Sequence, residues 1–336
     1  MRILVTGDQG YIGSVLVPIL QSRGHVVVGF DIGYFADCSF SPIDESYKQI
    51  RKDICDITAS DLDGVEAIIH LAGLSNDPAG ELQPYLTEQI NLQATIKLGQ
   101  FARSVGVNRL IYASSQSMYG ISSSNDELDE DRSEKTPVTT YARTKWEAEV
   151  ALKSLQTSEF LVICFRPSTV FGVSPRLRCD IVFNNFVACA YTTGKIEVLS
   201  DGSPWRPVVH IRDVCGAFLA GIEAPLSIVA GRSFNVGILN GNFTVRELAE
   251  AAQRVVPGTE IKFMGTHGGD SRTYKVSFSR ILSELRDWYK PEWDLDRGGR
   301  ELVDFFQEVN FTEADFRGPK TNRLPRLKQF LAEKVL

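Results

Sequence analysis

The 336-residue sequence has few of the features that mark specialised classes of protein. Its six cysteines, at positions 38, 55, 164, 179, 189 and 215, form no C-x-x-C pair. This spacing excludes the usual zinc sites and indicates reduced thiols. No run approaches ~20 consecutive apolar residues, and the strand-like start "MRILVTG" leaves no room for a signal peptide. We therefore expect a cytoplasmic protein.

Excess charge of either sign is also absent, since the formal net charge is only -6. This mild acidity offers no long-range attraction to nucleic acid or to an anionic membrane, so we expect neither as a partner. With 43% hydrophobic and 23% charged residues, the composition is that of a globular protein. The length suits one large α/β domain or two lobes.

The first third of the chain alternates short β-branched runs with amphipathic segments. The runs "RILVT", "HVVVGF", "AIIHLA" and "RLIYAS" read as strands buried on both faces. Between them lie helical candidates such as "YIGSVLVPILQSRG" and "TEQINLQATIKLGQFARSVG". This alternation predicts an α/β fold with a doubly wound parallel sheet of the Rossmann type.

The first strand-to-helix turn, "TGDQGYIGS", carries Gly7, Gly10 and Gly13. Glycines at this place let the backbone approach a pyrophosphate at the start of a helix. The second strand ends at Asp31, near the spacing expected for a carboxylate that binds an adenosine ribose. The alternative is that Asp31 is a turn residue before Gly33. Together these residues favour a bound dinucleotide.

Asp31 also favours NAD over NADP. A carboxylate accepts a hydrogen bond from a free 2′-hydroxyl and repels a 2′-phosphate. No Arg or Lys follows within residues 32–44 to reverse that preference.

The segment "YARTK" places Tyr141 and Lys145 four residues apart, on one face if the segment is helical. An ammonium beside a phenol lowers the pKa of the phenol. Taken alone, the pair is common on exposed helices.

The motifs "TGDQGYIG", "KDICD", "HLAG", "SSQSMYG", "YARTK" and "FRPSTVFG" occur in the order found in extended short-chain dehydrogenase/reductases. Over residues 1–278 the chain resembles the NAD-dependent nucleotide-sugar epimerase/dehydratase branch of that family. The resemblance implies an NAD-binding Rossmann domain over residues 1–172, to which residues 205–222 return. Residues 173–336 would form mainly a substrate-binding lobe and a C-terminal tail.

The same resemblance implies three catalytic residues. Tyr141 matches the base, Lys145 its partner, which also holds the nicotinamide ribose, and Ser115 the residue that hydrogen-bonds the reacting sugar hydroxyl. A phenol with a pKa of ~10 is a poor base at neutral pH, but a nearby ammonium and a cationic nicotinamide favour phenolate. Hydride would leave the same carbon for NAD.

Further positions follow from the resemblance one at a time. Asp53 matches the residue that accepts from the adenine amino group, although it could instead cap a turn, and Asn91 matches an architectural Asn. The implied cofactor contacts, besides Tyr141 and Lys145, are Gly7, Gly10, Tyr11, Ile12, Gly13, Asp31, Asp53, Ile54, Leu71, Ala72, Gly73 and Pro167. The implied substrate contacts are Ser115, Gln116, Asn184, Asn185, Arg206 and Arg272, the two arginines at a diphosphate.

Departures from the family pattern narrow the reaction. The 4,6-dehydratases follow the active-site Ser or Thr with Asp-Glu, where this chain has Gln116 and Ser117. A Gln cannot replace the acid that elimination requires. We predict a nucleotide-sugar epimerase acting at C4 with tightly held NAD. The alternatives are a 4-keto-sugar reductase or dehydrogenase, a 4,6-dehydratase and a non-catalytic NAD-binding protein, in falling order.

The remaining expectations concern assembly and surface segments. By resemblance we expect a homodimer that pairs the helices near residues 83–105 and 141–155. The acidic stretch over residues 125–134 is predicted to be a solvated loop. The tail beyond about residue 288 lies outside the family motifs, and its end, "RLPRLKQFLAEKVL", predicts an amphipathic helix that docks on the body or on a partner.

Overall fold

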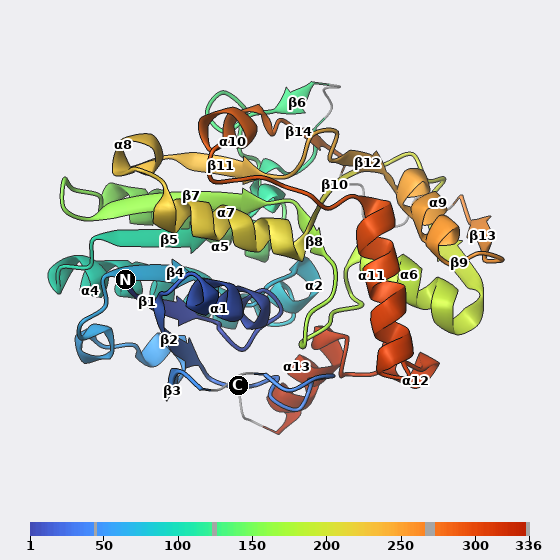
Figure 1. The fold of residues 1–336 in the computed structure, drawn as a ribbon, viewed down its shortest axis with the longest axis horizontal. Coiled ribbons are helices and arrows are strands. Elements are labelled where there is room, and N and C mark those ends of the chain that lie inside the picture. The colour runs from blue at the N-terminus through green and yellow to red at the C-terminus, as the bar shows by residue number, and fades with distance from the viewer. Residues whose placement is uncertain (44–45, 123–125, 266–272, 334–336) are drawn as a thin grey trace.

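A computed structural model describes residues 1–43, 46–122, 126–265 and 273–333. Its centre is a seven-stranded, all-parallel sheet with the strand order β11-β7-β5-β4-β1-β2-β3 (Figure 1). The strands are β1 (Arg2–Thr6), β2 (Val26–Asp31), β3 (Lys48–Arg51), β4 (Ala67–His70), β5 (Arg109–Ala113), β7 (Leu161–Pro167) and β11 (Ser233–Val236). The predicted doubly wound α/β fold is confirmed.

Helices cover both faces of this sheet, so its inner strands β1, β4, β5 and β7 are buried along most of their length. In β1, Ile3 and Val5 face a core shared with α1 (Gly13–Ser22) and α7 (Ile211–Glu223). Leu4 faces the opposite core, which it shares with residues of α4 (Ala94–Ser104) and α5 (Thr140–Ser154). The strand period of two thus assigns alternate side chains to the two cores.

The predicted helix over residues 83–105 consists of α3 (Pro84–Glu88), a π-turn over Gln89–Gln93 and α4. Asn91, within the π-turn, accepts from the backbone N–H of Leu74 at 2.8 Å and donates to its carbonyl at 3.0 Å. It therefore fixes the loop that follows β4, in agreement with the architectural role expected for it.

The second lobe has a separate core in which α6 (Val182–Thr193), α9 (Val245–Val255) and α11 (Leu295–Glu308) pack together. Its strands are β8 (Thr169–Phe171), β10 (Trp205–His210) and β12 (Asn242–Thr244) in one sheet, and β9 (Lys195–Val198) and β13 (Glu260–Phe263) in another. The other elements are β6 (Glu127–Leu128), β14 (Lys275–Val276), α2 (Asp77–Gly80), α8 (Leu226–Val229), α10 (Ser279–Glu284), α12 (Glu313–Arg317) and α13 (Arg323–Ala332).

The central sheet uses more of the later chain than the sequence suggested. The helix α7, over part of the expected residues 205–222, packs on the sheet. The edge strand β11 comes from residues that we had assigned to the substrate lobe, and it pairs with β7. These residues therefore belong to the central sheet, where β11 is a fully buried edge strand parallel to β7.

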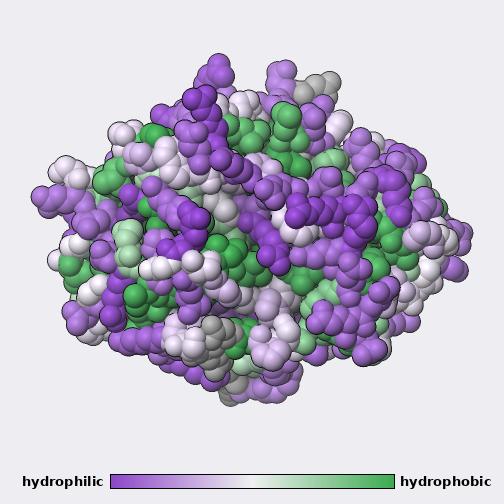
Figure 2. All heavy atoms as spheres, viewed as in Figure 1, coloured by the Kyte–Doolittle hydropathy of each residue, from purple (hydrophilic) through white to green (hydrophobic). Residues whose placement is uncertain are grey.

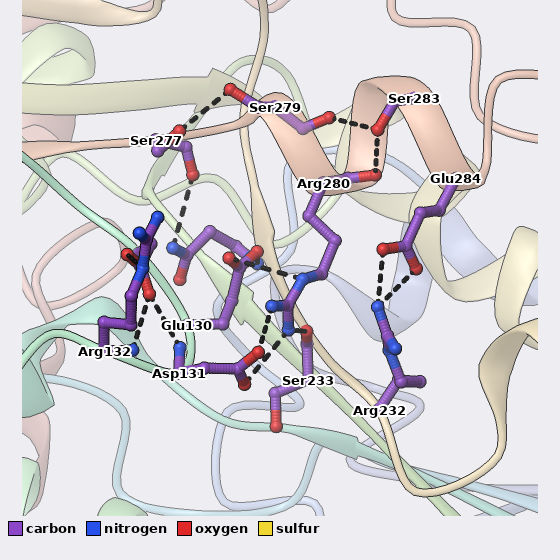
Figure 3. A network of polar contacts seen from close by, with 12 residues as sticks. Glu130, Asp131, Arg132, Arg232, Ser233, Ser277, Ser279, Arg280, Ser283 and Glu284 are labelled. Atoms are coloured by element: carbon purple, nitrogen blue, oxygen red, sulfur yellow. Dashed lines mark hydrogen bonds and ion pairs between the residues drawn. The ribbon is translucent and has the colours of Figure 1, made fainter.

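The described part of the acidic stretch, residues 126–134, is largely exposed, but one of its carboxylates is buried. Glu130 is 5% exposed and accepts from the backbone N–H of Asn235 at 2.8 Å. Arg280 of α10 forms ion pairs with Glu130 and Asp131, and Figure 3 shows the network that results. The expectation of a solvated stretch therefore holds for most of these residues, and the exception is Glu130, which an arginine distant in sequence pairs with in a buried position.

On the face shown in Figure 2, hydrophilic side chains predominate and hydrophobic ones lie in separated groups. Within the described ranges no helix combines the length and the apolar character that crossing a membrane requires.

Candidate active site

A cavity of about 580 Å³ opens at the carboxyl ends of the parallel strands, where ligands bind in open α/β sheets. Every predicted cofactor contact lines it, and so do Ser115, Gln116 and Arg206 among the predicted substrate contacts. The fold therefore brings together segments that are far apart in sequence.

The glycine-rich turn between β1 and α1 fits a dinucleotide. Gly7 has a φ of +72°, and a Cβ atom there would lie 2.8 Å from the backbone nitrogen of Ala72. A Cβ atom on Gly13 would lie 2.2 Å from the carbonyl oxygen of Gly7. The first turn of α1 contains no acidic residue. The turn is therefore tight, and the positive end of the α1 dipole faces the cavity without a competing carboxylate.

Asp31 lies at the end of β2, where its carboxylate accepts from the backbone N–H of Gly33 at 2.7 Å. Burial raises the pKa of Asp31, while Arg176 and Arg51 act to lower it. These cations lie outside the residues 32–44 that we had searched for basic groups. Arg51 lies opposite Asp31 in the β2–β3 pairing. Arg176 comes from the loop before α6.

Asp53 supports both readings of its role. Its side chain accepts from the backbone N–H of Cys55 at 2.8 Å, so it caps the 3-10 turn Ile54–Asp56. Asp53 also lines the cavity beside Ile54. The cap is observed, and the contact of Asp53 with a bound adenine stays a prediction.

The helix α5 positions the predicted base. Thr139 caps its N-terminus by accepting from Ala142 N–H, which places Tyr141 in the first turn and Lys145 one turn later. Burial raises the pKa of Tyr141, while a hydrogen bond from Ser115 and the charge of Arg178 lower it. Ser115 is held in turn by the backbone N–H of Ser117 at 3.1 Å.

Lys145 is 5% exposed, and its ammonium donates to the carbonyl of Ala113 at 2.8 Å. It also lies over the ring of Tyr112, 4.8 Å from the centroid. Burial lowers the pKa of Lys145 to about 8. Its ammonium is therefore fixed at the end of β5, beside the cavity.

Gln116 lines the cavity, but its amide is engaged elsewhere. The nitrogen donates to the carbonyls of Arg166 at 2.9 Å and Val236 at 3.4 Å, and the oxygen accepts from Ser168 at 3.2 Å. This residue therefore joins the ends of β7 and β11. It supplies neither an acid nor a free amide to a substrate.

Two of the predicted substrate contacts, Asn184 and Asn185, are not part of the cavity wall. Asn184 is fully buried and lies away from the cavity wall, where it accepts from Gly172 N–H and donates to the carbonyl of Arg178. Asn185 is also absent from the wall and donates to the carbonyl of Cys179. Because neither residue lines the cavity wall, a contact of either with the substrate stays a prediction. Arg272 lies outside the described residues.

The sequence reading missed two parts of the cavity wall. Arg178 and Asp180, which precede α6, form an ion pair at 2.8 Å that is largely buried. Arg323 and Leu327, from the C-terminal helix α13, close another part of the wall. These residues belong to none of the family motifs. The spacing R-x-D at Arg178 and Asp180 was the one local pattern that could have indicated a charged pair there.

The fold and the cavity together define a Rossmann-type enzyme that uses a dinucleotide. A model described as the NAD dependent epimerase/dehydratase family matches residues 3–237, and the chain belongs to this family. The predicted cofactor, NAD, is thereby confirmed.

The chain is 29% identical over 324 residues to the UDP-glucose 4-epimerase of Mycolicibacterium smegmatis, covering 91% of this chain and 99% of that protein. The solved structure of TunA, described as an NAD-dependent NDP-hexosamine 5,6-dehydratase, matches with a TM-score of 0.80, 22% identity and coverages of 91% and 98%. A UDP-glucuronic acid 4-epimerase from Bacillus cereus, solved with UDP-glucuronic acid and NAD, gives a TM-score of 0.78, 21% identity and coverages of 92% and 100%. The two structural likenesses support the fold.

Proposed function

We propose that this protein is an NAD-dependent nucleotide-sugar epimerase that inverts C4 of its substrate. The observation that carries the proposal is the convergence of Ser115, Tyr141 and Lys145 on the cavity that also contains the glycine-rich turn and Asp31. The curated 4-epimerase that matches almost the full chain supports the same reaction class.

The chain's own residues supply the acid–base part of the reaction. Tyr141 takes the proton of the sugar hydroxyl as phenolate, and Ser115 hydrogen-bonds the same hydroxyl. Burial raises the pKa of Tyr141, and the hydrogen bond with Ser115 acts against this and favours the phenolate, while Lys145 would hold the nicotinamide ribose. When bound, NAD would supply the hydride acceptor and donor that the reaction at C4 requires. Gly7, Gly10 and Gly13 bind the cofactor diphosphate, and Asp31 binds the adenosine ribose.

The environment of Gln116 separates this reaction from dehydration. Removal of water across C5 and C6 needs a proton donor beside Ser115. In this position Gln116 is neutral and its amide is hydrogen-bonded to the backbone. A reductase or dehydrogenase remains the second candidate, because it needs the same three catalytic residues.

Proton NMR of the protein as purified, mixed with nucleoside-diphosphate hexoses and no added cofactor, tests the proposal. We expect a new anomeric doublet that grows to a fixed ratio, and Tyr141→Phe should reduce its rate by at least 100-fold because the base is lost. Tyr191→Phe, at a half-buried residue of α6 that lies off the cavity wall, is the matched control and should retain the rate.

Other outcomes of this experiment would contradict the proposal. Turnover only when stoichiometric NADH or NAD is supplied would identify a reductase or dehydrogenase. A 6-deoxy-4-keto product would identify a dehydratase. Unaltered turnover in Tyr141→Phe would remove Tyr141 from the mechanism.

The proposal includes the setting in which the enzyme works. We infer a cytoplasmic homodimer whose first 172 residues bind the cofactor, with later segments returning, while the second lobe binds the sugar nucleotide. The exposed apolar residues of α3 and α5, Tyr85 and Val150, support pairing through these helices.

A further inference from the structure

We propose that the C-terminal helix α13 belongs to the nucleotide-binding site and that Arg323, its first residue, binds a diphosphate in the cavity. This inference deepens the proposed function and rests on it, because it concerns the same cavity. Residues of this helix lie outside every motif that the sequence reading used.

The helix α13 packs onto the segment that follows β2, as Figure 1 shows for the red helix and the blue chain beside it. The guanidinium of Arg323 lies over the ring of Phe35, 4.5 Å from its centroid, and the rings of Phe330 and Tyr34 are 5.2 Å apart. Arg323 and Leu327 line the cavity and are only 6% and 3% exposed. The tail is therefore part of the cavity wall.

The charges on this part of the wall are unequal. The carboxylate of Asp180 accepts from Arg178 at 2.8 and 3.0 Å and from Asn76 at 2.9 Å, so it neutralises Arg178. Arg323 instead donates to the carbonyls of Arg176 at 3.0 Å and Lys320 at 3.3 Å. It forms no ion pair with any carboxylate in the described part of the chain.

A buried cation without a carboxylate partner is costly unless an anion joins it. Burial, reinforced by the nearby Arg178, lowers the pKa of Arg323 to about 10. The first turn of α13 contains no acidic residue of its own, and Asp180, which accepts from the backbone N–H of Arg323, offsets only part of the positive charge because it also pairs with Arg178. An anion in the cavity beside Arg323 would offset the remaining charge.

A diphosphate is the anion that the cavity is built to receive. It is common to NAD and to a nucleoside-diphosphate sugar, and a guanidinium fork suits phosphate oxygens. The segment that accepts from Arg323 also reaches the glycine-rich turn, since Arg176 donates to the carbonyl of Gln9 at 3.1 Å. This connection favours the dinucleotide as the source of the diphosphate.

Isothermal titration calorimetry of the full chain, stripped of nucleotide, tests this site with NAD and with UDP as probes. We expect Arg323→Gln to weaken NAD binding about tenfold or more, since a hydrogen bond to a charged group is lost. It should also lower the amount of NAD that co-purifies. The matched control is Arg326→Gln, in the same helix, because Arg326 pairs with Asp37 and lies off the cavity wall. The control should bind NAD as the wild type does.

Each result has a defined meaning. Weaker binding of UDP, with NAD unaffected, would retain the diphosphate site but assign it to the sugar nucleotide. Unchanged affinity for both probes would overturn the proposal. If Arg323→Gln fails to fold, Arg323→Met keeps the apolar stem on Phe35 and is judged by the same criterion. Wild-type protein that binds NAD but does not epimerise sugars would refute only the proposed reaction.

Discussion

At the scale of single residues, the surroundings of Tyr141 differ from those that the Tyr-Lys spacing predicts. Lys145 was expected to lower the pKa of Tyr141 from the next turn of the helix. In the folded chain burial raises the pKa of Tyr141, and the groups that act to lower it are Ser115, by hydrogen bonding, and to a smaller extent the charge of Arg178. The ammonium of Lys145 is directed to the carbonyl of Ala113. Arg178 reaches the site from the second lobe, so its position in the sequence does not predict its proximity to Tyr141.

The burial of Asp8, in the glycine-rich turn, predicts that the stability of the fold depends on pH. Burial raises the pKa of this carboxyl from 3.8 to about 7, and its Oδ1 has no hydrogen-bond partner although Tyr47 donates to Oδ2 at 2.6 Å. Because the folded state holds the proton more tightly, the free energy of unfolding should fall as pH rises from about 4 to about 7. Asp8→Asn should remove this fall.

Thermal denaturation at pH 4 and pH 8 checks the effect. We expect Asp8→Asn to be more stable than wild type at pH 8, by on the order of 2 to 4 kcal/mol, and close to it at pH 4. Asp63→Asn, at an exposed residue, should change neither value. Equal pH dependence in wild type and Asp8→Asn would refute the assignment.

At the scale of elements, a buried ion pair joins α5 to β7. Glu149 and Arg166 pair at 2.6 Å with side chains that are 0% and 2% exposed, and Ser114 and Ser233 also donate to Glu149. Although burial opposes it, the Arg166 guanidinium holds the pKa of Glu149 below its usual value. The pair fixes the catalytic helix against the sheet directly behind Ser114.

Replacing one partner should therefore destabilise the fold. We expect Glu149→Gln to lower the free energy of unfolding by about 3 to 5 kcal/mol, because Arg166 would stay buried without a counterion. Glu147→Gln lies on the same helix and breaks a surface pair with Arg143, so it should cost less than about 1 kcal/mol. Urea denaturation compares the two variants. Similar losses in both would contradict a special role for the buried pair.

Elements near the N-terminus were predictable because their signals are local. The strands β1, β2, β4 and β5 follow continuous apolar runs, and α1 begins at the third glycine of its turn. The strand β11 and the helix α13 were not placed, because their partners are distant in sequence. A short apolar run or an amphipathic helix does not specify which surface it covers.

At the scale of the whole molecule, the homodimer proposal predicts a mass of twice 37.3 kDa in light scattering. Val150 of α5 is 49% exposed, and Val150→Asp should convert the dimer to a monomer by placing a charge in an apolar interface. Leu239→Asp, at a residue that is 76% exposed outside these helices, should leave the dimer intact. A monomeric wild type would reject the pairing.

The sequence by itself determined the Rossmann-type sheet and the cofactor, and it predicted the set Ser115, Tyr141 and Lys145 that lines the cavity, because each is encoded by residues close together or in a fixed order. Only the tertiary structure decided the rest of the cavity. It assigned Asn184 and Asn185 to backbone hydrogen bonds, engaged the amide of Gln116, and brought Arg178 and the helix α13 to the wall. The physical reason is that burial and charge pairing depend on contacts between distant segments, which local patterns do not specify.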